Sequence, residues 1–209
     1  MELGIYELVS FTFLGLLPIV NPFSTAPMFL ALAKDLSPSD QVRQATKAAI
    51  VATIFLTFFL VFGDAVIEFF GITLPSIRIS GGIIIFVIGY RMLLAPPDNG
   101  AGKEDSSKSV VDFAISPLAV PSLSGPGSIS IAIGLGATIP EGSEVSGFTA
   151  MAVGIALVMF VAWLAMVLSS RIVSYMGRNL IDGITRIMGF ILVSMAVQFV
   201  INGVQELGI

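Results

Sequence analysis

Long, almost uncharged apolar stretches constrain this 209-residue chain more than any other feature of its sequence. Apolar residues run without a break in segments such as 83–88, whereas a membrane-spanning β-strand would alternate apolar with polar residues. A helix needs about 20 apolar residues to cross the hydrocarbon core of a bilayer. Six such stretches lie at about 3–33, 44–62, 75–94, 111–137, 147–168 and 184–204. The sequence therefore predicts an all-α polytopic membrane protein with six transmembrane helices.

The composition excludes several classes of protein. Charged residues make up 11% of the chain, against roughly 25% in a water-soluble domain, so a soluble enzyme is excluded. The net charge is −4 and no basic run occurs, so a nucleic-acid partner is not expected. The chain has neither Cys nor His, the usual thiolate and imidazole ligands of metals. We therefore expect no enzymatic activity, no metal site and no cofactor.

The distribution of basic residues predicts the orientation in the membrane, because Lys and Arg favour cytoplasmic loops. The two terminal segments carry acidic residues only, namely Glu2, Glu7 and Glu206. Eight basic residues flank the first, third and fifth connections: Lys34, Arg43, Lys47, Arg91, Lys103, Lys108, Arg171 and Arg178. We expect a multi-pass protein of the inner (plasma) membrane with both termini on the extracytoplasmic side.

A weak internal repeat relates the two halves of the chain. Residues 19–27 align with 119–127, and the Arg-Ile-x-Gly pattern of 78–81 recurs at 186–189. The predicted units are a first three-span repeat over 1–95, a cytoplasmic loop over 96–110 and a second three-span repeat over 111–209. Because three is odd, the second unit enters the membrane inverted. Inverted repeats are typical of secondary transporters.

Two of the predicted spans contain helix-breaking residues. The first is interrupted at Pro22 and Pro27, and the fourth at Pro121 and again at 125–127. Unwound backbone cannot face lipid, so both breaks must be packed in protein or line a wet cavity. Free N–H groups at the start of each second half-helix favour a carboxylate, and freed carbonyls before each break favour an ammonium group. Both features together suit a small zwitterion, although proline kinks without a ligand are the simpler alternative.

The side chains at the breaks are small, polar and uncharged, and Gly125 and Gly127 permit close approach of a ligand to the backbone. We predict a small pocket without ionised groups. The candidate substrate-binding residues are Asn21, Pro22, Phe23, Ser24, Thr25, Ser122, Ser124, Gly125, Gly127 and Ser128.

Four further polar residues inside the predicted spans are candidates for gating or structural roles. Arg78 and Arg186 each begin the third span of a half, where they would attract carboxylates, lock helices together or extend to the headgroups. Gln198 and Asn202, four residues apart, would line the pathway or hydrogen-bond between helices. No acidic residue lies near the middle of a span, and coupling to either Na⁺ or H⁺ stays open.

Several motifs together resemble the MarC family of inner-membrane proteins. They are Asn21-Pro22-Phe23-Ser24, Arg78-Ile79-Ser80-Gly81-Gly82, Pro117-Leu118-Ala119-Val120-Pro121 and Ser124-Gly125-Pro126-Gly127. The resemblance covers essentially the whole chain in the family's order. It implies a six-span inverted repeat, with substrate held by the unwound parts of spans one and four and elevator-like movement of one bundle against another. Some members look like transporters of alanine or glycine, whereas the family name reflects a link to multiple antibiotic resistance.

The leading hypothesis is thus a secondary transporter of small neutral amino acids that works by alternating access. The alternatives are a small-solute channel, because an Asn-Pro half-helix is similar to the aquaporin pattern, and a membrane protein linked to drug tolerance. A membrane enzyme fits poorly, because Ser124 and Ser128 have no nearby His or Lys in the sequence. The sequence leaves open the exact substrate, the coupling ion, import or export, elevator or rocking movement, and whether the chain forms a homo-oligomer.

Overall fold

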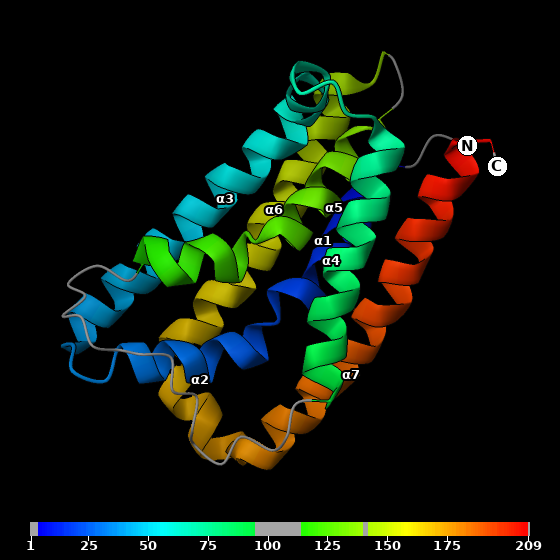
Figure 1. The fold of residues 1–209 in the computed structure, drawn as a ribbon. Coiled ribbons are helices and arrows are strands. Elements are labelled where there is room, and N and C mark those ends of the chain that lie inside the picture. Colours follow the sequence, from blue (N-terminus) through cyan, green and yellow to red (C-terminus); the bar gives the residue numbers. More distant parts are fainter. Residues whose placement is uncertain (1–3, 95–113, 140–141, 209) are drawn as a thin grey trace.

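The computed structural model describes residues 4–94, 114–139 and 142–208, and within these ranges the chain is helical with short connections and no strand. Figure 1 shows the helices gathered into one bundle. The elements are α1 (Ile5–Val20), α2 (Pro22–Leu32), α3 (Pro38–Phe69), α4 (Leu74–Leu94), the π-helix η1 (Ala114–Leu123), α5 (Pro126–Gly136), α6 (Glu144–Val167) and α7 (Ser169–Glu206). The predicted loop over 96–110 lies outside the described residues.

Four described helices are long and apolar enough to cross a membrane: α3, α4, α6 and the 179–206 part of α7. A fifth crossing results if α1 and α2, which are bent by 46° at their junction, count as one span. The predicted fourth span, 111–137, appears as η1 and α5 instead. With 11 residues, α5 is too short to cross alone. The described chain is thus an all-helical membrane protein with four to five candidate spans, and the six-span arrangement stays a prediction.

Two helices extend beyond their predicted bounds for local reasons. The sequence predicts a second span over 44–62, but α3 already begins at Pro38, because Ser37 caps it by accepting from the Asp40 N–H at 3.2 Å. The sixth predicted span, 184–204, is the end of the longer helix α7. Gly177, with φ 67° and ψ 162°, kinks α7 before the span.

Glycines set the closest helix contacts. α4 and α7 pack antiparallel, since Gly82 faces Ala196, Gly89 faces Gly189, and Gly203 faces Pro75. At each position a Cβ atom would lie 2.8–3.0 Å from a backbone carbonyl oxygen of the facing helix. This small-residue contact is the usual way for membrane helices to approach closely. α4 and α7 therefore form a tight pair within the bundle (Figure 1).

Large apolar side chains remain exposed along the outer faces of the helices, for example Phe58 and Phe62 on α3 and Phe190 on α7. In water such surfaces would be costly, whereas in a bilayer they contact lipid tails. α1 begins and α7 ends at the same end of the bundle, and the α2–α3 and α6–α7 connections lie at the other (Figure 1). This arrangement agrees with the predicted alternation of the connections.

Candidate functional site

The first helix break is a single residue, Asn21. It adopts a left-handed conformation (φ 40°, ψ 75°), ends α1 and caps α2, whose first residue is Pro22. Asparagine tolerates this conformation better than other non-glycine residues. The prediction that Pro27 also breaks the span is wrong, because α2 continues through it to Leu32. One proline removes one hydrogen bond from the helix, and a membrane helix tolerates that loss.

The polar side chains of the first break bind each other and the local backbone. Asn21 Nδ2 donates to Ser24 Oγ at 2.7 Å, and Asn21 Oδ1 accepts from the Ser24 N–H at 3.4 Å. Thr25 Oγ1 lies 3.1 Å from the carbonyl oxygens of both Val20 and Asn21. The Val20 carbonyl, expected to be free for a ligand, thus has a partner in Thr25. The α2 N-terminus is capped.

The fourth predicted span is interrupted at Ser124 and Gly125, which confirms the break predicted at 125–127, whereas the break predicted at Pro121 is wrong. The π-helix η1 continues to Leu123, and the Ser124 N–H reaches back five residues to the Ala119 carbonyl at 2.9 Å. This wider turn absorbs the proline without ending the helix. α5 then begins at Pro126.

The two half-helices α2 and α5 match each other, in a register that differs from the predicted alignment. Both have 11 residues, and both have proline at the first helical position and serine at the third. Pro22 therefore corresponds to Pro126, not to Ser122, and Ser24 corresponds to Ser128. The Pro-x-Ser pattern fixes the start of each half-helix, since proline suits the first turn.

In the first turn of α5, Gly127 and Ser128 are buried whereas Pro126 is exposed, and the N-cap residue Gly125 supplies no side-chain hydrogen bond. Ser124 Oγ donates to the Ala119 carbonyl at 2.8 Å and Ser128 Oγ donates to the Leu123 carbonyl at 3.3 Å. Both hydroxyls thus donate to backbone carbonyls of the break. Counting from the start of α5, the N–H group of Ile129 is the first that donates to a described backbone carbonyl, that of Gly125, at 3.0 Å. No described backbone carbonyl accepts from the N–H groups of Gly127 and Ser128, and the helix dipole at this end favours an anionic partner.

The structure brings the start of α5 against the first break. A Cβ atom on Gly127 would collide with the side chain of Ile19, in the last turn of α1, and would lie 3.1 Å from Ile85 of α4. The candidate substrate site therefore lies where the end of α1, the start of α5 and the middle of α4 meet. Seven predicted site residues are buried, namely Asn21, Pro22, Thr25, Ser124, Gly125, Gly127 and Ser128, and Phe23, Ser24 and Ser122 are half-buried.

One residue at this site was not predicted from the sequence. Thr185 of α7 places its Oγ1 2.8 Å from Ser24 Oγ, which connects the first break to the last helix. A single threonine in an apolar span carries no signal of its own. Its position directly before the second Arg-Ile-x-Gly motif was the one available indication.

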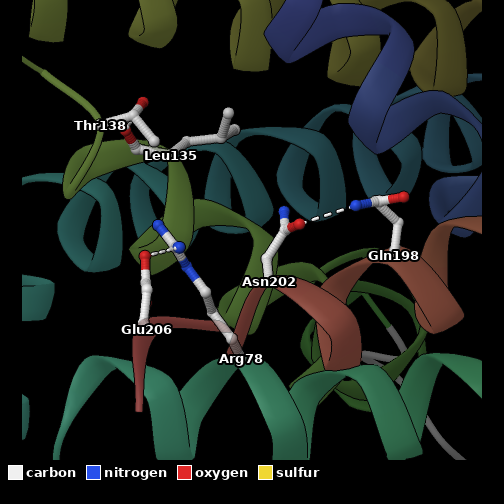
Figure 2. A network of polar contacts seen from close by, with 6 residues as sticks. All are labelled: Arg78, Leu135, Thr138, Gln198, Asn202 and Glu206. Atoms are coloured by element: carbon white, nitrogen blue, oxygen red, sulfur yellow. Dashed lines mark hydrogen bonds and ion pairs between the residues drawn. The ribbon is translucent and has the colours of Figure 1, made fainter. Parts of the chain in front are cut away.

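Three of the four candidate gating residues lie elsewhere: Arg78, Gln198 and Asn202. Figure 2 shows Arg78 of α4 paired with Glu206 of α7, beside the C-terminal end of α5. The side chain of Arg78 is 14% exposed and that of Glu206 is 37% exposed. Gln198 donates to Asn202 at 2.7 Å, and both residues lie on α7 (Figure 2). This bond therefore differs from the predicted hydrogen bond between two helices.

The two groups of polar residues are separated by the length of α5. Arg78 lies near Leu135 and Thr138, at the end of α5, whereas the candidate substrate site lies at its start (Figure 2). Eleven helical residues span about 16 Å. Arg186, the counterpart of Arg78 in the repeated motif, is exposed. The two arginines therefore have different surroundings, and Arg78 does not contact the breaks.

Comparison with known proteins identifies the family. The profile described as "MarC family integral membrane protein" matches residues 6–207. The chain belongs to the MarC family. The inner membrane protein MarC of Escherichia coli strain SMS-3-5 is 32% identical to it over 215 residues, covering 98% of this chain and 97% of that relative. The MarC proteins of Salmonella paratyphi A and Salmonella typhimurium LT2 match with the same identity and coverage. No solved structure matches significantly.

Proposed function

We propose that this MarC-family protein is a secondary transporter of small neutral amino acids, such as glycine and alanine, across the inner membrane. The observation that carries the proposal is the first turn of α5, where Gly127 and Ser128 are buried, the N-cap Gly125 provides no side-chain cap, and the last turn of α1 packs closely. A helix N-terminus buried in this way requires a partner for its N–H groups. A carboxylate supplies both the hydrogen-bond acceptors and the negative charge.

The chemistry of the site favours a substrate without net charge. The described residues at the two breaks are neutral, so a net charge on the substrate would be buried without a counter-charge. In a zwitterion the carboxylate meets the α5 N-terminus, and the ammonium meets carbonyl and hydroxyl oxygens of the first break. The side chains of Ile19 and Ile85 lie close against Gly127, so little space remains beside the first turn of α5. This arrangement suits glycine and alanine better than larger amino acids.

We further propose that six spans form two inverted repeats, in which η1 and α5 together make the fourth crossing. The matching lengths of α2 and α5, with proline at the start of each, support the duplication. The antiparallel packing of α4 on α7, the third span of each half, supports the inversion. Alternating access then follows if the two halves exchange conformations.

The experiment is uptake of labelled glycine and alanine into proteoliposomes containing the purified protein. We expect saturable uptake that unlabelled glycine or alanine inhibits. Imposing a Na⁺ gradient and a H⁺ gradient separately identifies the coupling ion. Absence of saturable uptake of every small neutral amino acid would refute the proposal, and flux that never saturates would indicate a channel.

A further inference from the structure

The hydroxyl group of Ser24 occupies an unusual position among the polar groups at the two breaks. The hydroxyls of Thr25, Ser124 and Ser128 all donate to backbone carbonyls within their own break. Ser24 Oγ instead accepts from the Asn21 side chain and lies 2.8 Å from Thr185 Oγ1 of α7. Among the described residues, it is the hydroxyl at the breaks that bonds to a side chain of another helix.

The hydrogen-bonding capacity of the two hydroxyls defines what remains for a ligand. A serine hydroxyl has one proton and two lone pairs. One lone pair of Ser24 accepts from Asn21 Nδ2, and either the proton or the second lone pair engages Thr185. If Ser24 donates its proton to Thr185, one lone pair of Ser24 remains to accept from a ligand, whereas the opposite direction leaves only the proton. Both residues are half-buried.

We propose that Thr185 accepts the Ser24 proton and is thereby a positioning residue for substrate binding, because a lone pair of Ser24 then points to the ammonium group of the substrate. This inference rests on the proposed function. Thr185 lies 161 residues from Ser24, on the last helix of the second half of the chain. The contact therefore also makes the geometry of the first break depend on the position of α7. The required feature is a hydroxyl at position 185. Serine should therefore function in place of threonine, and valine should not.

The test compares Thr185→Val with Thr185→Ser in glycine uptake by proteoliposomes. We expect Thr185→Val to raise KM about fivefold, the effect of one ordinary hydrogen bond, with kcat changed less than about twofold. Thr185→Ser should keep the wild-type KM. The double variant Ser24→Ala/Thr185→Val should resemble Ser24→Ala alone, because the two hydroxyls act as a unit. Ser194→Ala, which removes a hydroxyl bonded within α7 to the Phe190 carbonyl, is the matched control and should leave KM unchanged.

Three outcomes distinguish the explanations. Unchanged KM in Thr185→Val, or equal damage in Thr185→Ser, would overturn the inference while wild-type uptake upholds the proposed function. Absence of saturable uptake by the wild type would refute the proposed function, and the inference with it. If Thr185→Val transports too weakly for kinetics, glycine-dependent stabilisation against thermal unfolding replaces KM. The glycine concentration needed for half of that stabilisation should rise by the same factor, and an unchanged value would overturn the inference.

Discussion

Gly89 and Gly189 lie back to back where α4 crosses α7, and a Cβ atom on either would lie 2.8 Å from the carbonyl oxygen of the other. Because the obstructing atoms belong to the backbone, neither helix can yield by turning a side chain. The third helices of the two halves are thus held at a fixed distance by two glycines.

Gly189→Ala should therefore destabilise the protein by about 1–3 kcal/mol, the usual effect of overpacking a close contact. The matched control is Gly183→Ala in the same helix, where no atom lies within 4 Å of the added Cβ. That change should stabilise α7 by up to about 1 kcal/mol, because alanine is the better helix former. Thermal unfolding in detergent measures both. Equal changes in stability for the two substitutions would contradict the close contact between Gly89 and Gly189.

Gly127→Ala should impair glycine transport more than it impairs folding. The new methyl group collides with the end of the Ile19 side chain, which can turn aside, but it occupies space at the first turn of α5. We expect uptake to fall by roughly tenfold, equivalent to about 1.4 kcal/mol. Gly134→Ala, in the same helix, meets only Phe199 at 3.6 Å and should transport normally. Normal uptake by Gly127→Ala would exclude the α5 N-terminus from the substrate site.

Thr12→Val should stabilise the protein. Thr12 is fully buried where α1 packs on α6, and its hydroxyl has no hydrogen-bond partner among the described residues. Replacing an unpaired buried hydroxyl by a methyl group should raise the free energy of unfolding by about 1 kcal/mol. Thr25→Val, which removes a hydroxyl that donates to the backbone of the first break, should lower it by a similar amount. The two unfolding midpoints should move in opposite directions, and a fall in both would show that the Thr12 hydroxyl has a partner.

The absence of cysteine makes the orientation directly measurable. Gln205→Cys, at the end of α7, and Asp35→Cys, between α2 and α3, each place one exposed thiol at opposite ends of the bundle. In cells whose outer membrane is permeable and whose inner membrane is intact, a membrane-impermeant thiol reagent should label the cysteine at position 205 and not the one at position 35. Permeabilised cells should show both. The reverse pattern would place the C-terminus in the cytoplasm and contradict the positive-inside prediction.

The sequence predicts a helix break best where neighbouring residues both favour it. Asn21 followed by Pro22 combines a residue that tolerates the left-handed conformation with one that suits a helix start, and the break lies there. Pro27 and Pro121 carry the same proline signal without breaking their helices. A helix can absorb a single proline by losing one bond or widening into a π-turn, and the choice depends on packing that the local sequence does not contain.

Contacts between distant segments also cannot be predicted from the local sequence, because they depend on the packing of the helices. Gln198 and Asn202 share a face, as their spacing predicts, but the spacing does not reveal that they bond to each other. The residue types of Thr185 and Glu206 do not reveal their roles, because these depend on Ser24 and Arg78, which are more than 100 residues away. The candidate substrate residues were easier to predict because glycine, proline and serine gather at both breaks.

Counterflow of glycine tests the central claim most directly. Proteoliposomes containing the wild-type protein are loaded with unlabelled glycine and diluted into a trace of labelled glycine, with no ion gradient. A carrier with alternating access predicts a transient accumulation of label. Preloading with alanine should reproduce this accumulation, and Gly127→Ala should strongly reduce it. Equilibration of label without any overshoot, at the same rate in loaded and empty vesicles, would contradict the account.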